Sequence, residues 1–189
     1  MKKMFIAALV GAIIVFAWQA ISHMALNNVL HKSMSHTPPN GEQVLAAMQG
    51  AETGMYMYPG EVKGESWDDA VKRMQGKPGV FIMYDKSMNM NMGMPMVIGF
   101  ILDFLGVWIV VSMLGYARER LKTSWDRWWA VMLFALFLII MQYLMGWNWF
   151  GYPFSHVLEE GVDTLITWAL CGLWLSWYLG RNMTKAPAA

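Results

Sequence analysis

A carboxylate and two amides interrupt otherwise apolar runs of the chain. Asp103 stands about two helical turns into the run 96–116, where an unpaired charge costs on the order of 3 kcal/mol in a bilayer. Gln19 and Gln142 lie in two other apolar runs. These three residues are candidates for an intramembrane proton site. For Asp103 we favour a structural hydrogen bond to a neighbouring helix over a functional role.

A second group of polar side chains has the residue types of a metal site. His156, Glu159 and Asp163 are spaced i, i+3 and i+7, with Glu160 beside them, so they share one helix face. His23 is expected at a similar depth of the bundle. Imidazole and carboxylate suit Zn²⁺, Mn²⁺ or iron. Acidic residues in the first turn of a helix also interact favourably with its dipole, which explains the pattern without a metal.

A methionine-rich tract offers a softer kind of site. Residues 88–96 read MNMNMGMPM, which places Met88, Met90, Met92 and Met94 at every second position. Thioethers select Cu(I), and in an extended segment these sulfurs would lie on one face. Copper or another transition metal is therefore a candidate cofactor. The chain holds 19 Met in total, and Met is also a flexible filler of apolar helices.

Other chemistries are not supported by the sequence. It contains no P-loop, no Gly-x-Ser-x-Gly, no His-Glu-x-x-His and no Cys-x-x-Cys-His. The single cysteine, Cys171, has no partner for an intrachain disulfide or a thiolate cluster. The formal charge of +1 gives no field that would attract nucleic acid. We therefore expect no nucleic-acid partner and favour a protein that is not an enzyme.

Transmembrane helices are the elements expected to position these residues. Only 14% of the residues are charged, against roughly 25% in soluble domains. Apolar runs of about 20 residues span a hydrocarbon core, and this chain has four of them. We predict an all-α membrane protein that begins with a transmembrane helix within 1–27. A three-helix region follows over 95–180, with helices at 96–116, 128–146 and 157–179, and the chain ends in a tail over 181–189.

The start of the first run has an alternative interpretation. Lys2 and Lys3 before this run also resemble a signal peptide, but the bulky Trp18 near the possible cleavage site favours an uncleaved anchor.

The polar residues 28–94 separate the first and second helices. Asn40 and Ser66 are predicted to cap two short helices. Residues 54–60 and 79–84 are short aromatic and β-branched runs bounded by Gly and Pro, which favours a pair of strands. We therefore predict a small mixed α/β domain outside the bilayer.

Basic residues predict the orientation. Lys2 and Lys3, the loop 117–127, and Arg181 with Lys185 carry positive charge, whereas the connection 147–155 has no Lys or Arg. The positive-inside rule then places both termini in the cytoplasm. Tryptophans at both ends of the third helix are typical of interfacial belts. We predict a multi-pass protein of a bacterial inner membrane with residues 28–94 in the periplasm.

Two motifs carry a resemblance. The first helix contains Gly11-x4-Phe16-x-Trp18-x3-Ser22-His23, and the insertion contains Gly54-x-Tyr56-x2-Pro59-Gly60. This pattern resembles a family of small uncharacterised bacterial integral membrane proteins with no assigned function. The resemblance implies an N-terminal anchor, an external segment and a C-terminal helical bundle. It implies no reaction, and the methionine tract is not part of the pattern.

Three function hypotheses follow. The first is a non-catalytic accessory or assembly subunit of a larger energy-conserving or transport complex, whose partners are the lipid bilayer and other membrane subunits. The second is an extracytoplasmic copper-handling membrane protein that uses the methionine tract. The third is a proton-coupled carrier or membrane enzyme that uses Asp103.

Overall fold

The chain groups into a helical bundle and a smaller insertion. The computed structural model describes residues 1–34 and 36–183. The bundle comprises Met1–His36 with Met92–Ala189, and the insertion is Thr37–Asn91. The insertion is thus shorter than the predicted 28–94 at both ends, because residues 28–36 and 92–94 group with the bundle.

Four helices of the described residues are long and apolar enough to cross a membrane. The first consists of α1 (Lys2–Ala20) and the π-helical segment η1 (Ile21–Ala25), and the second is α5 (Gly93–Tyr116). The third is made of three consecutive segments: α6 (Ser124–Leu138), the π-helical segment η3 (Ile139–Leu144) and α7 (Met145–Phe150). The fourth is α8 (Phe154–Met183). After the first helix come the short helices α2 (Asn27–Leu30) and η2 (Lys32–Met34). The prediction of a mainly helical chain with four such helices is confirmed.

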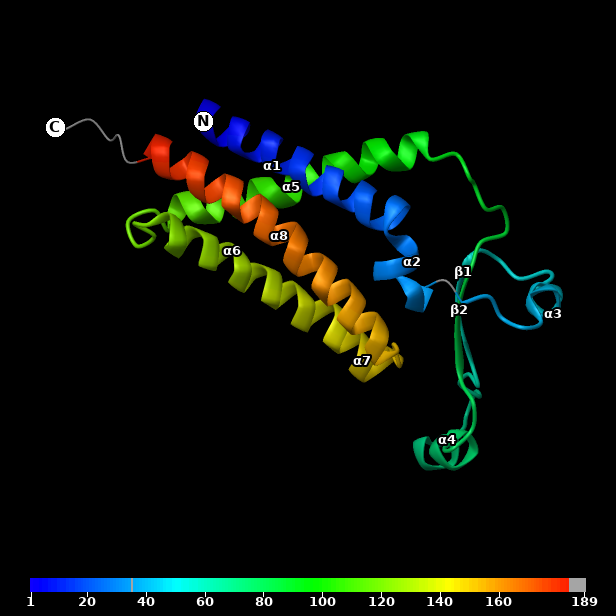
Figure 1. Cartoon of the computed structure of the whole chain (residues 1–189). Helices are drawn as coiled ribbons and strands as arrows, with labels where there is room; N and C mark the ends of the chain where they lie inside the picture. The colour runs from blue at the N-terminus through cyan, green and yellow to red at the C-terminus, as the bar shows by residue number, and fades with distance from the viewer. Residues whose placement is uncertain (35, 184–189) are drawn as a thin grey trace. The chain divides into compact units, whose positions relative to one another are not determined.

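The helix α1 lies between α5 and α8, and α8 packs against α6 (Figure 1). Their shared apolar core lies toward the end of the bundle that holds the N-terminus, and includes Ala7, Ala8, Val107, Val111, Leu114, Val131, Cys171 and Leu175. Gly11 makes this close packing possible. A Cβ atom there would lie only 2.7 Å from Cγ1 of Val107 and 3.3 Å from Sγ of Cys171.

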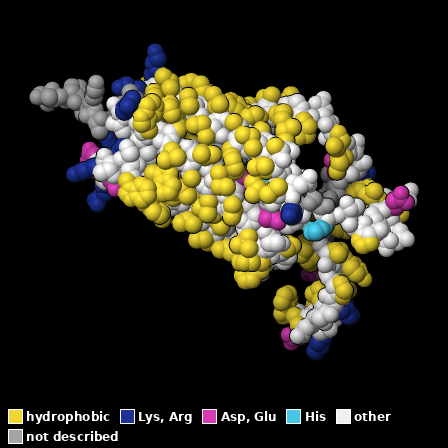
Figure 2. Space-filling view, in the orientation of Figure 1, with side chains coloured by type: hydrophobic (Ala, Val, Ile, Leu, Met, Phe, Trp, Pro, Cys, Tyr) yellow, Lys and Arg dark blue, Asp and Glu magenta, His cyan; other side chains and the backbone are white. Residues whose placement is uncertain are grey.

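Three basic segments of the bundle share one of its ends. The N-terminus, the connection between α5 and α6, and the last turns of α8 all lie at that end (Figure 1). Figure 2 shows Lys and Arg side chains gathered there, with hydrophobic side chains over the visible face of the helices. Arg127 is the buried exception: its guanidinium donates to the backbone oxygens of Leu121, Lys122 and Ser176. It therefore fastens the connection to α8.

The insertion contains a two-stranded antiparallel sheet and two short helices. Its elements are α3 (Gly41–Ala47), β1 (Gly54–Tyr58), α4 (Trp67–Met74) and β2 (Val80–Tyr84). The strands pair from Gly54 opposite Tyr84 to Tyr58 opposite Val80, which confirms the predicted pairing. The predicted cap at Ser66 is also confirmed, since its hydroxyl accepts from the Asp69 backbone N–H. At Asn40 the prediction is wrong, because the side chain makes no capping bond.

An ion pair anchors α4 to the segment before it. Arg73 donates through Nε and Nη2 to the two carboxylate oxygens of Glu65, both at 2.8 Å. It also donates to the Gly60 backbone oxygen. These hydrogen bonds and the guanidinium charge hold the pKa of Glu65 below its usual range and raise that of Arg73.

A candidate metal site in a polar cavity of the bundle

Both π-helical segments carry polar side chains into the same part of the bundle. The segment η1 contains Ser22 and His23, and η3 contains Gln142 and Tyr143. A π-helical turn inserts an extra residue into a helix and frequently marks a functional site. The sequence predicted continuous helices here, since a π turn leaves the apolar composition of a run unchanged.

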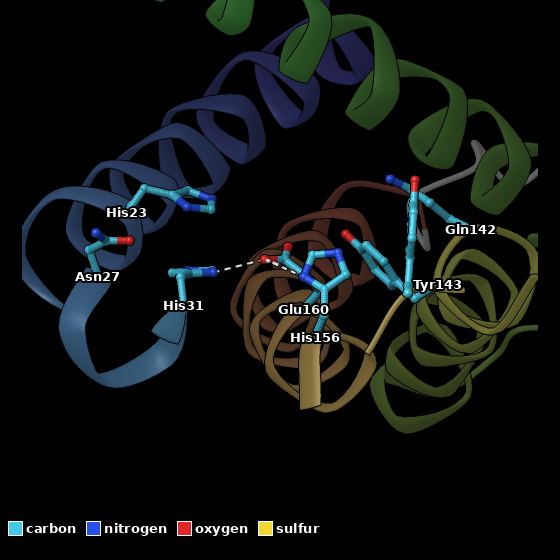
Figure 3. A pocket seen from close by; sticks show the side chains of 8 residues that line it. His23, Asn27, His31, Gln142, Tyr143, His156 and Glu160 are labelled. Atoms are coloured by element: carbon cyan, nitrogen blue, oxygen red, sulfur yellow. Dashed lines mark hydrogen bonds and ion pairs between the residues drawn. The ribbon is translucent and has the colours of Figure 1, made fainter. Parts of the chain in front are cut away.

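These side chains line a partly open cavity with a volume of about 390 Å³. The lining residues are His23, Asn27, His31, Gln142, Tyr143, Tyr152, His156 and Glu160. Figure 3 shows His23 and His31 projecting toward Glu160 and His156 of α8, with Tyr143 and Gln142 on the far side. A smaller cavity of about 180 Å³ shares His23, Gln142, Tyr143 and Glu160 and extends to Asp163. Polar groups thus continue from the cavity mouth into the bundle.

A chain of buried and partly buried hydrogen bonds joins the first helix to α8. The Asp163 carboxylate oxygen Oδ1 accepts from Trp18 Nε1 at 2.8 Å and from Ser22 Oγ at 2.5 Å. Ser22 Oγ in turn lies 2.8 Å from His31 Nε2. The other ring nitrogen of His31, Nδ1, lies 2.9 Å from Glu160 Oε1. Each side chain in this network of hydrogen bonds therefore has a partner, as burial demands.

Three residues bring potential metal ligands together. His23, His31 and Asp163 each offer one ligand atom, and these atoms lie within 4.8 Å of one another. The imidazole rings of His23 and His31 stack with their centroids 4.1 Å apart. The exposed His23 ring has no hydrogen bond to any described residue, so its nitrogens are free to coordinate. Two imidazoles and a carboxylate form a ligand set suited to Zn²⁺, Mn²⁺ or Fe²⁺.

The contacts of Ser22, His31 and Glu160 follow the order of a serine hydrolase triad, but they do not make a nucleophile. Ser22 is fully buried, with 0% of its surface exposed. Its hydroxyl donates to Asp163 rather than to the histidine. A catalytic serine must instead give its proton to the base and reach the substrate. The arrangement therefore supports a structural role for Ser22, which positions Asp163 and His31.

The predicted face of α8 is divided between two environments. Asp163 lies beside His23, as the sequence suggested, with His31 as an additional neighbour. Glu159 instead accepts hydrogen bonds from the backbone N–H and the hydroxyl of Ser33. His156 lines the cavity, with Nδ1 3.4 Å from Ser33 Oγ and 4.0 Å from Glu160 Oε1. Glu159 and His156 thus fasten η2 to α8, outside the group of three ligands.

Of the three proton-site candidates, Gln19 and Gln142 line the cavities, whereas Asp103 does not. Gln19 donates through Nε2 to Asp103 Oδ1 at 3.2 Å and also lines the smaller cavity. The second oxygen of Asp103, Oδ2, is buried and has no hydrogen-bond partner among the described residues. Gln142 lines both cavities. Asp103 therefore lies next to the cavity lining, through Gln19, but does not line it.

The methionine tract is not one extended strand. Met88 and Met90 belong to the insertion, whereas Met92 precedes α5 and Met94 lies within it. Between them, Asn89 accepts from the Asn91 backbone N–H, as in an Asx turn. The expectation of alternating sulfurs along one extended face is therefore wrong for this tract.

Sequence reasoning missed His31, which it assigned to the polar insertion. A signal was present: His23, Asn27 and His31 are spaced i, i+4 and i+8, and all three line the cavity. Comparison of the chain with protein-family models, curated proteins and solved structures finds no match. The function must therefore be argued from the site itself.

Proposed function

We propose that this protein binds a divalent transition-metal ion, such as Zn²⁺, Mn²⁺ or Fe²⁺, in the cavity of its helical bundle. The ligands are His23, His31 and Asp163. The observation that carries the proposal is that their ligand atoms lie within 4.8 Å of one another beside an open cavity. In the sequence these residues come from three separate segments, so the fold is required to assemble the set.

The separations fit a metal site after a small movement. Ligand bonds to Zn²⁺ are about 2.0 to 2.2 Å long, so two ligand atoms of one ion in a tetrahedral site lie about 3.4 Å apart. The present separations, of up to 4.8 Å, can exceed that value, so the ligands must move closer to bind an ion. Rotation of the exposed His23 ring, which has no hydrogen bond to a described residue, would close this difference. Coordination by Nε2 of His31 would replace its contact with Ser22 Oγ.

Glu160 supports the role of His31 as a ligand. A histidine that binds a metal usually donates its other ring N–H to a carboxylate, which fixes the tautomer and the ring orientation. Nδ1 of His31 lies 2.9 Å from Glu160 Oε1, so Nε2 is the nitrogen left for the metal. Trp18 and Ser22 orient the Asp163 carboxylate in the same way.

Three protein ligands beside a cavity favour an open site. Structural zinc sites have four protein ligands, whereas sites that exchange or activate a bound molecule keep one position for water or substrate. The cavity of about 390 Å³ has room for such a molecule. We therefore propose a functional metal rather than a purely structural one.

We propose the same membrane setting as the sequence predicts. The shared end of the basic segments supports an orientation with both termini in the cytoplasm and the cavity toward the opposite side of the membrane. A role as accessory subunit is compatible with this site and stays a prediction. A role as a proton-coupled carrier that uses Asp103 also stays a prediction. Copurification of other subunits from mild detergent would test the accessory role, and the phenotype of Asp103→Asn would test the carrier role.

Metal binding by the full-length protein tests the proposal. The protein would be purified in detergent, treated with a chelator and titrated calorimetrically with ZnSO₄ and MnCl₂, with elemental analysis of the complex. We expect one bound ion. His23→Ala should weaken binding about 100-fold. It should lower the stability of the metal-free protein only slightly, because His23 is exposed and makes no hydrogen bond to a described residue, although its stacking on His31 is lost.

His36→Ala is the matched control, since His36 is an exposed histidine outside the cavity lining. It should bind metal as tightly as the unchanged protein. The proposal is wrong if the unchanged protein binds neither metal, or if His23→Ala binds as tightly as His36→Ala does.

A further inference from the structure

Three methionines lie on one face of the β1–β2 hairpin in the insertion. Met55 is directly opposite Met83, and Met57 is opposite Phe81. Residues two apart in a strand, and residues opposite each other in a pair, project from the same face of the sheet. We call Met55, Met57, Phe81 and Met83 the methionine face.

All four side chains of this face are exposed, whereas on the opposite face only Tyr58 and Val80, at one end of the hairpin, are exposed. Met55, Met57 and Met83 are 77%, 51% and 80% exposed, whereas Tyr56 and Ile82 on the other face are half-buried. The solvated face of an antiparallel sheet is ordinarily polar. Four exposed side chains without a charge or hydroxyl therefore indicate that the methionine face has an occupant.

We propose that the methionine face binds a Cu(I) ion through the thioether sulfurs of Met55, Met57 and Met83. Directly opposite residues have Cβ atoms about 5 Å apart, and diagonal ones about 7 to 8 Å apart. A methionine side chain has three rotatable bonds, so three sulfurs can converge on one ion from these positions. Thioethers are soft ligands, which prefer Cu(I) to harder divalent ions.

Phe81 completes the surroundings of the ion. It is paired with Met57 and is the only member of the methionine face without sulfur. An aromatic ring attracts a cation over its face through its quadrupole. The ring can therefore stabilise the monovalent ion without adding a bond to it.

This site is separate from the one proposed in the bundle and does not rest on it. The bundle offers imidazole and carboxylate, whereas the methionine face offers sulfur alone. The site also differs from the tract Met88–Met94, whose members do not share a strand. The pairing of β1 with β2 brings together sulfurs that are 28 positions apart, Met55 and Met83.

An apolar partner is the competing occupant of this face. Replacing the methionines by leucine distinguishes an apolar partner from Cu(I), because leucine keeps the apolar area of methionine and removes the sulfur. An apolar partner accepts the change to leucine, whereas Cu(I) requires the thioether.

A competition titration tests the proposal. The full-length protein in detergent would be titrated anaerobically against the Cu(I) complex of bicinchoninate. We expect one tightly bound Cu(I), and in the variant M55L/M57L/M83L an affinity lower by about 100-fold. The control M88L/M90L/M92L also removes three exposed thioethers and should change the affinity by less than about threefold. Both variants keep the bundle ligands, so a difference between their Cu(I) affinities is due to the thioethers of the hairpin.

A second measurement needs no triple variant. Methionine methyl resonances would be followed by NMR while the unchanged protein receives one equivalent of Ag(I), a mimic of Cu(I). We expect the three resonances assigned through M55L, M57L and M83L to shift together. The proposal is overturned if these resonances do not move, if M55L/M57L/M83L retains the full affinity, or if only M88L/M90L/M92L loses it.

Discussion

Trp18 donates its indole N–H to the Asp163 carboxylate at 2.8 Å, although the two residues are 145 positions apart in the sequence. Ser22, one helical turn further along the first helix, donates to the same oxygen. Two donors from one helix therefore fix a carboxylate on another. This contact both holds α8 against the first helix and sets the direction in which Asp163 can bind a cation.

Replacing Trp18 by Phe should destabilise the bundle. Phe keeps most of the aromatic volume but removes the donor, and hydrogen bonds to charged groups contribute about 1.5 to 3 kcal/mol. We expect a loss of that size in the free energy of unfolding, measured by SDS titration in mixed micelles. Trp125→Phe is the control, because the indole of Trp125 is exposed and makes no hydrogen bond to a described residue. Equal losses in both variants would contradict this role of Trp18.

Gly11→Ala should loosen the packing of α1 against its neighbours. The added methyl would lie 2.7 Å from Cγ1 of the buried Val107, and overpacking of a core costs about 1 to 3 kcal/mol. At Gly99 a Cβ atom meets nothing within 4 Å. Gly99→Ala should therefore be neutral or stabilising, by up to about 1 kcal/mol, since Ala is the better helix former. The melting temperatures of the two variants would be compared in one detergent. A smaller decrease for Gly11→Ala than for Gly99→Ala would contradict the close packing of Gly11 against Val107.

Arg127→Lys should be destabilising although it keeps the charge. The Arg127 guanidinium donates to Leu121, Lys122 and Ser176 carbonyls and to the Ser124 hydroxyl. A lysine ammonium has three donors on one atom and cannot span these acceptors. We expect a loss of about 2 to 3 kcal/mol in the free energy of unfolding. Arg120→Lys, at an exposed arginine of the same connection, should change it by less than about 0.5 kcal/mol.

The helices and the hairpin could be predicted because their signals are local. Apolar runs of sufficient length predict α5 and α8 from composition alone, and Gly and Pro bound the strands that become β1 and β2. The cap at Ser66 needs only Asp69 three positions later. Each of these features depends on residues that are close in the sequence.

The candidate sites depend on contacts that the sequence does not encode locally. His31 joins Asp163 only because the chain turns back after η1 and lays α2 and η2 beside α8. The split of the predicted face between Asp163 and Glu159 follows from the position of Ser33, which no helical periodicity reports. The methionine face likewise depends on the register of β1 and β2. The tract 88–96, by contrast, suggested a copper site because its methionines alternate along the sequence.

Acid should weaken the insertion through Glu65. Its ion pair with Arg73 lowers the pKa of the carboxyl below the ordinary value of 4.5. A lowered pKa means that the folded state favours the ionised form, so the stabilisation is present above pH 4.5 and is lost as the pH falls through the folded pKa. The NMR resonance of the Arg73 Nε–H should follow this protonation, with a midpoint below that of an unpaired glutamate.

Glu65→Gln separates the charge from the shape of this contact. The amide keeps the size of the side chain but not its charge, so the variant should be less stable than the unchanged protein at neutral pH. The difference should shrink as the pH falls, because the unchanged protein then loses the same charge. Glu61→Gln, at an exposed glutamate of the same segment, should show no such pH-dependent difference. Thermal unfolding from neutral to acidic pH measures all three proteins, and a difference for Glu65→Gln that persists at acidic pH would mean that the ion pair contributes nothing.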